Sequence, residues 1–107
     1  MELEDEVQNV QSTFDQFVAA VKEANFSSYL ELHSPDVAAE VSEELFVRNS
    51  ERARAHDFSF NLEGIEFDGR FATVRFSVVA NDGAAEHNDS AQVTLIREGE
   101  RWSLYET

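Results

Sequence analysis

The chain has 107 residues, with 22 Asp and Glu, eight Lys and Arg and no Cys, which gives a formal net charge of −14 at pH 7. This length fits one domain, residues 1–107, with a single apolar core. The lack of Cys excludes a disulfide framework, a thiolate metal site and a Cys nucleophile. A charge this negative repels phosphates and anionic lipids, so we expect neither nucleic acid nor a membrane as partner.

The acidity extends over both halves of the chain, and Lys and Ile are sparse. This composition favours a halophilic protein, because molar salt screens the self-repulsion that low salt leaves in place. An ordinary acidic protein is the alternative. The first residues, "MELEDEVQNV", contain neither a basic leader nor an apolar run, which predicts a cytoplasmic protein.

The N-terminal half of the chain has helical patterning. Apolar residues from Leu3 to Ala24, spaced alternately four and three apart, predict a helix of about 22 residues. We expect Asn25 to end this helix and "FSSYLELHS" to form a short second one. Ser34 before Pro35, and later Ser42, are N-cap signals. The middle third is therefore helical, as one bent helix or two short ones, and its predicted core positions are Val37, Val41, Leu45 and Ala53.

From Phe58 the apolar period changes to two, which predicts strands. Asp68-Gly69 signals a two-residue hairpin turn, which would set Ile65 opposite Ala72. The apolar parity slips at Glu63-Gly64, and one extra residue there reconciles both strands. The sequence thus predicts a β-bulge that bends the sheet, with the pairs Leu62 and Val74, Phe60 and Phe76, and Phe58 and Val78.

Two further strands follow, and "REGERWSLYE" closes a second hairpin. A turn at Glu98-Gly99 would place Leu95 near Trp102, whereas a turn at Gly99-Glu100 shifts the register by two and keeps the same faces. The predicted fold class is α+β, with N-terminal helices packed on a curved four-stranded antiparallel meander.

This order of elements, with "ANFSSYLELHSPDV" after a long first helix and "REGERWSLYE" at the end, resembles the nuclear transport factor 2-like superfamily, which includes SnoaL-like and ketosteroid isomerase-like proteins. The resemblance implies a cystatin-like cone, in which a curved sheet wraps around the long helix and the open end often holds a pocket. It also implies homodimers. Enzymes of the family use acid and base side chains inside the cone, and none of those positions matches here residue by residue.

Tyr29 and His33 are the candidate catalytic residues. They are four residues apart and therefore neighbours on a helix. His33 could act as a base at the mouth of the pocket while Tyr29 donates to an oxyanion. The alternative is two amphipathic residues on the helix surface. A small apolar ligand would contact aromatic residues inside the cone, for which the candidates are Phe14, Phe60, Phe76 and Trp102.

Other clusters favour structural interpretations. Arg48 and Arg52 share a helical face, which predicts a salt-bridged surface more than an anion site. His56-Asp57 favours a histidine at a helix C-terminus over a base with its orienting acid. Glu86, His87 and Asp89 could bind a divalent cation, but a solvated loop is favoured. We therefore expect no metal and no cofactor.

The predicted outer face of the sheet has more large apolar side chains than a solvated face needs, and we expect a homodimer through it: Phe71, Thr73, Arg75, Val79, Thr94, Ile96 and Tyr105. No nucleophile elbow, P-loop or dinucleotide motif occurs. The sequence thus favours a non-enzymatic ligand-binding or scaffold module, and the alternative is a small isomerase, cyclase or dehydratase. A pocket with convergent polar groups would favour an enzyme, whereas a cone filled by aromatic rings would favour a scaffold.

Overall fold

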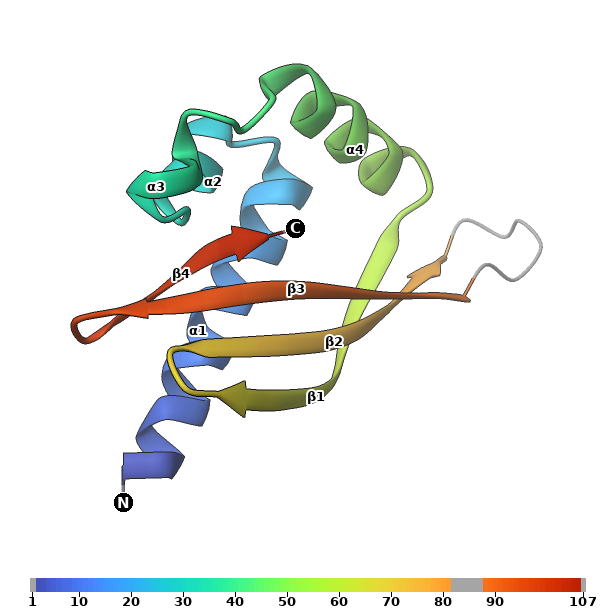
Figure 1. The fold of residues 1–107 in the computed structure, drawn as a ribbon. Helices are drawn as coiled ribbons and strands as arrows, with labels where there is room; N and C mark the ends of the chain where they lie inside the picture. Colours follow the sequence, from blue (N-terminus) through green and yellow to red (C-terminus); the bar gives the residue numbers. More distant parts are fainter. Residues whose placement is uncertain (1, 82–87, 107) are drawn as a thin grey trace.

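The structure, a computed structural model, describes residues 2–81 and 88–106. Its elements in chain order are α1 (Glu2–Glu23), α2 (Phe26–Glu31), α3 (Pro35–Ala38), α4 (Glu43–Ala55), β1 (Phe58–Asp68), β2 (Phe71–Ala80), β3 (Asn88–Glu98) and β4 (Arg101–Glu106). Figure 1 shows α1 crossing the sheet while α2, α3 and α4 gather near one end of it. The predicted α+β class, with helices packed on a four-stranded antiparallel meander, is confirmed.

The first helix buries the predicted apolar stripe between Val10 and Val21 and ends in a Schellman motif. Asn25 N donates to the Ala20 carbonyl (2.9 Å) and Ala24 N to the Val21 carbonyl (3.2 Å), with Ala24 in the left-handed region at φ +56°. Asn25 also begins α2, because its side-chain oxygen accepts from Ser28 N at 3.2 Å. One residue thus ends α1 and caps α2.

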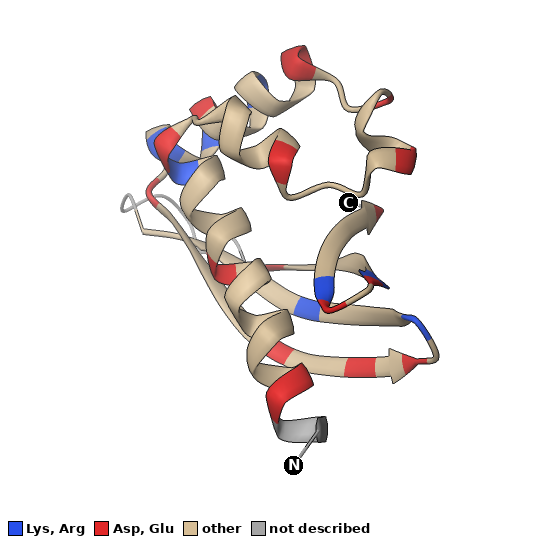
Figure 2. Ribbon diagram, turned by 90° about the vertical axis from the view of Figure 1, so that its left-hand side faces the viewer, with Lys and Arg blue, Asp and Glu red and all other residues tan. Residues whose placement is uncertain are grey.

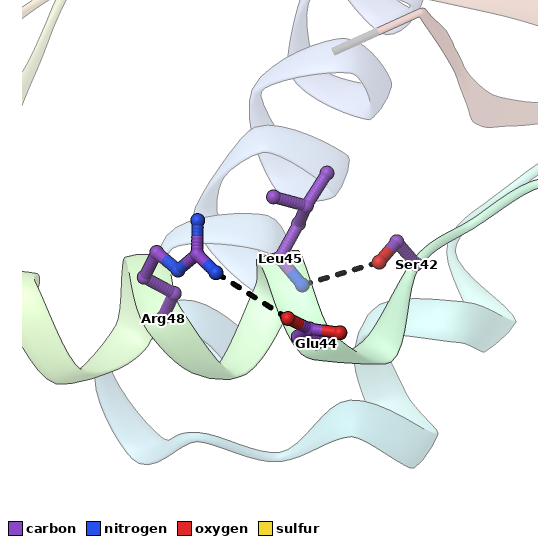
Figure 3. A network of polar contacts seen from close by, with 4 residues as sticks. All are labelled: Ser42, Glu44, Leu45 and Arg48. Atoms are coloured by element: carbon purple, nitrogen blue, oxygen red, sulfur yellow. Dashed lines mark hydrogen bonds and ion pairs between the residues drawn. The ribbon is translucent and has the colours of Figure 1, made fainter.

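The middle third of the chain forms two helices, each begun by the predicted serine. Ser34 caps α3 with Pro35 at the first position, and Ser42 Oγ accepts from Leu45 N at 3.2 Å at the start of α4 (Figure 3). The prediction that Leu45 faces the core is wrong, since it is 54% exposed. Phe46, only 3% exposed, takes that place. The buried face of α4 consists of Phe46, Ser50 and Ala53, and the polar Ser50 interrupts the apolar pattern.

The sheet has the order β1-β2-β3-β4, and the predicted bulge is confirmed. The register shifts between Leu62 and Gly64, which leaves Glu63 as the extra residue. The bulge bends β1, as extra residues in antiparallel pairs do.

The predicted register of the first hairpin is wrong by two residues. Asp68 pairs with Phe71, so Ile65 lies opposite Val74, and the remaining pairs shift in the same way: Leu62 with Phe76, Phe60 with Val78 and Phe58 with Ala80. Gly69, at φ +61°, is the first central residue of the turn, a position where type II′ hairpins take glycine. The second hairpin also has a glycine with positive φ as the first central residue of its turn, because Glu98 pairs with Arg101 and Gly99 has φ +68°. A shift of two preserves the faces.

The core lies between α1 and the concave face of the sheet. Phe14 packs on Phe76 with ring centroids 5.1 Å apart, and the edge of Phe67 meets Trp102 at 5.7 Å. Thr13 Oγ1 donates to the Trp102 carbonyl at 3.1 Å, which links α1 to β4 across the core.

The segment after α2 runs along the edge of β4. Leu104 N donates to the Leu32 carbonyl (2.7 Å) and Ser34 N donates to the Leu104 carbonyl (2.8 Å), so His33 forms a parallel bridge with Leu104. Ser34 Oγ also donates to Glu98 at 2.8 Å. These bonds fix the backbone of His33 against the sheet.

The outer face of the sheet is only partly open. Ile96 is 5% exposed there, whereas Phe71, directly opposite it on β2, is 38% exposed. The rings of Phe71 and Tyr105 lie 5.5 Å apart. Because β3 lies between β2 and β4, these rings meet above β3 and shield Ile96.

Acidic positions are spread over both helices and strands in Figure 2, in line with the net charge of −14. Within residues 2–81 and 88–106, no helix has both the length and the apolar composition needed to cross a bilayer.

Candidate functional site

A cavity of about 870 Å³ opens between α4, α2 and one end of the sheet; we call it the cone cavity. Its apolar wall comes from α1 and the strands, and it consists mainly of Phe17, Phe60, Phe76, Val78 and Val93. Its polar lining includes Asn49 and Arg52 of α4, His56 at the C-cap of that helix, and Asp89 and Gln92 of β3. This volume lies within the range of small-molecule pockets, roughly 300–1,000 Å³. The cone is therefore not filled by its aromatic rings.

His33 lines the cone cavity and is 6% exposed. Its Nδ1 lies 2.8 Å from the Tyr29 carbonyl oxygen. A carbonyl oxygen can only accept, so Nδ1 carries the hydrogen and Nε2 keeps the free electron pair of the neutral ring. Burial lowers the pKa of His33 below 6.5, and the bond to Tyr29 offsets this only in part. At neutral pH the ring is therefore an uncharged acceptor and base.

Tyr29 belongs to an aromatic cluster beside this histidine. Its ring centroid lies 4.4 Å from that of Phe46 and 4.7 Å from that of His33, with the His33 ring edge-on. Phe17 packs on the other side at 6.2 Å. The structure thus brings the two candidate catalytic residues together at the wall of one cavity.

The overall architecture matches solved structures. No family model and no curated protein matches the sequence. A candidate NTF2-like transpeptidase from Campylobacter jejuni is similar with a TM-score of 0.66 at 14% identity, over 92% of this chain and 99% of that one. A candidate dehydratase of the NTF2-like family from Streptomyces avermitilis reaches 0.64 at 16% identity, over 97% of each chain. A de novo designed NTF2 fold protein reaches 0.65 at 11% identity, over 92% of this chain and 83% of that one.

The fold is nuclear transport factor 2-like. Identities this low establish the fold alone, so the chemistry of the site must be argued from its own residues.

The candidate ligand contacts separate into two places in the NTF2-like cone. Phe60 and Phe76 line the cone cavity. Phe14 lies in the packed core against Phe76, and Trp102 is buried beside Phe67. The sequence pattern marks all four as inward-facing but does not indicate how far along the cone each one lies.

The alternatives for the histidines can also be compared with the structure. The alternative that His33 lies on the helix surface is wrong, because His33 is buried. It is oriented by a backbone carbonyl. His56 is exposed and stacks on Phe58 at 5.9 Å, at the C-cap of α4.

Of the loop candidates, Glu86 and His87 lie outside the described residues. In the described part of the chain, no three acids and histidines are grouped to hold a metal ion.

Sequence reasoning missed Arg52 as a cavity residue. Of the two arginines predicted to form a salt-bridged surface, Arg48 does so, with Nη2 3.4 Å from Glu44 (Figure 3). Arg52 lines the cone cavity together with Asn49 and His56. The spacing of three and four among these polar residues was the available signal, since it places them on one helical face.

A second cavity of about 930 Å³ lies along the other side of α1, and His33 lines it too. Its α1 wall is polar and mostly uncharged, from Asn9, Ser12, Thr13 and Gln16. Arg101 of β4 also lines this cavity, and it donates to the Glu31 carbonyl. His33 therefore borders both cavities.

Proposed function

We propose that this protein binds a small, mostly apolar organic molecule in the cone cavity, with His33 accepting a hydrogen bond from it. The observation that carries the proposal is a cavity of about 870 Å³ with an aromatic wall and a neutral imidazole. Nδ1 is engaged by Tyr29, so Nε2 is the ring nitrogen left for a ligand. A scaffold would need no such space.

Binding can be tested with 1-pyrenebutanol, an uncharged fluorescent probe, followed by its anisotropy. Val78 lines the cavity, and its neighbour Val79 lies on the opposite face of β2 and outside the cavity lining. We expect Val78→Trp to fill the cavity and weaken binding at least about tenfold, roughly the loss of 1.4 kcal/mol. Val79→Trp, the matched control, should leave the affinity unchanged. Equal affinities for both variants, or no binding by the wild type, would contradict the proposal.

A second candidate is a small enzyme of the isomerase, cyclase or dehydratase type. The tautomer of His33 favours it, because an uncharged Nε2 beside an apolar wall can take a proton from a bound molecule. Tyr29, in ring contact with His33, is the nearest candidate to donate to the developing oxyanion. Binding alone does not require this chemistry, so the enzyme is the more demanding hypothesis.

A further inference from the structure

We infer that the molecule bound in the cone cavity carries a carboxylate, and that Arg52 of α4 binds it. This inference rests on the binding function proposed above and names the chemical class of the ligand. It comes from the position of Arg52, from its lack of an acidic partner and from the combination of apolar and polar side chains in the cavity lining.

The geometry of α4 brings polar groups to the cavity. Leu45, Asn49, Arg52 and His56 are spaced four, three and four apart and all line it. Residues at this spacing share one face of a helix. The strands contribute aromatic and aliphatic side chains, such as Phe60 and Val78, together with the polar Asp89 and Gln92 of β3. A molecule in the cavity would therefore have an apolar body against the aromatic rings and a polar group that can reach Arg52.

Arg52 differs from the arginines that have partners. Arg48 pairs with Glu44 at 3.4 Å, Arg75 pairs with Glu66 at 3.1 Å, and Arg97 pairs with Glu6. Within residues 2–81 and 88–106, Arg52 has no acid within ion-pair distance. Lys22, Arg54 and Arg70 also have no such acid there, but they line neither cavity. Arg101 has no such acid in the described residues either and lines the second cavity, but its guanidinium group donates to the Glu31 carbonyl. An unpaired cation that faces a cavity, in a chain with 22 acids, is available to a ligand anion.

The other charges of the lining limit the kind of anion. Glu40 and Asp89 also line the cavity, and the whole chain is strongly negative. A phosphate with two charges would be repelled by this field. A carboxylate has one charge and can accept two parallel hydrogen bonds from the planar guanidinium group, so direct contact with Arg52 can offset the repulsion. The ligand class that fits is an apolar monocarboxylic acid.

The experiment compares two probes that differ at the carboxylate, 1-pyrenebutyric acid and 1-pyrenebutanol. Arg52→Gln removes the charge and keeps most of the side-chain length. Arg48→Gln, one turn earlier on α4 and paired with Glu44, is the matched control. We expect Arg52→Gln to weaken binding of the acid about tenfold or more, the loss of a charge-assisted hydrogen bond. Binding of the alcohol should change less than about twofold, and Arg48→Gln should affect neither probe. Circular dichroism confirms that both variants are folded.

The possible failures are distinguishable. If neither probe binds the wild-type protein, the binding function itself is contradicted. If the alcohol binds but Arg52→Gln leaves the ratio of the two affinities unchanged, only the carboxylate inference is overturned. The same holds if Arg48→Gln lowers that ratio as much as Arg52→Gln does. Added NaCl should reduce the preference for the acid, because salt screens an exposed ion pair.

Discussion

At the scale of single residues, His33 is the side chain whose chemistry depends most on its surroundings. Its backbone is held against Leu104, its Nδ1 is bound by Tyr29, and burial lowers its pKa below 6.5. The neutral form, which can act as a base, therefore predominates at pH 6.5 and above and is lost as the pH falls through the lowered pKa.

This behaviour predicts a pH profile for the enzyme hypothesis. The substrate is 5-nitrobenzisoxazole, which opens when a base removes its carbon-bound proton. After subtraction of the buffer rate, we expect turnover to be level at neutral pH and to fall to half at a pH below 6.5. His33→Asn keeps a donor near the Tyr29 carbonyl and should lower the rate roughly a hundredfold. His56→Asn, at the other cavity histidine, is the control. A rate that His33→Asn leaves unchanged would exclude His33 as the base.

At the scale of elements, α1 ends with an alanine where glycine is preferred. Ala24 has φ +56°, a conformation that costs residues with a Cβ about 1–2 kcal/mol. Replacing Ala24 with glycine removes this cost. Part of the resulting stabilisation is offset, because glycine gives the unfolded chain a larger conformational entropy. We therefore predict that Ala24→Gly raises the free energy of unfolding by about 0.5–1 kcal/mol, measured by urea titration. Ala19→Gly, at an exposed position inside the same helix, should lower it by about 1 kcal/mol. Destabilisation by both variants would contradict this account of the helix end.

The elements also show what sequence could and could not predict. The α1 stripe, the caps Ser34 and Ser42 and the bulge at Glu63-Gly64 follow from local patterns, and the structure has all of them. The hairpin registers do not, because a shift of two preserves every face, and Gly69 and Gly99 can have the positive φ found here as either central residue of the turn.

The site was less predictable than the fold. Tyr29 and His33 could be paired from their spacing. Which face of α4 borders a cavity depends on packing: buried Ser50 interrupts the apolar pattern there, and Arg52 lies on the cavity side.

At the scale of the whole molecule, the net charge and the outer sheet face both affect whether two copies of the chain associate. We propose that a second copy covers this face, where Phe71 is 38% exposed and its ring meets Tyr105. Two copies that each carry −14 repel one another, and salt screens this repulsion. We also propose that the protein works at high salt, where such a dimer is favoured.

Light scattering after size exclusion tests both proposals. We predict a larger dimer fraction in 1 M NaCl than in 0.1 M, and mainly monomer for Phe71→Glu at either concentration. Val47→Glu is the matched control, because Val47 is also an exposed large apolar residue but lies on α4. A monomeric wild type in 1 M NaCl, or equal effects of the two variants, would contradict a dimer through this face.

The run of backbone from Leu32 to Ser34 beside β4 has a consequence for aggregation. Free sheet edges offer unpaired N–H and C=O groups to strands of other molecules and can seed fibrils. Here one edge is occupied around Leu104 by the chain itself, and the other, β1, is interrupted by an extra acidic residue, Glu63. The sheet is thereby protected against growth by strand addition at both sides.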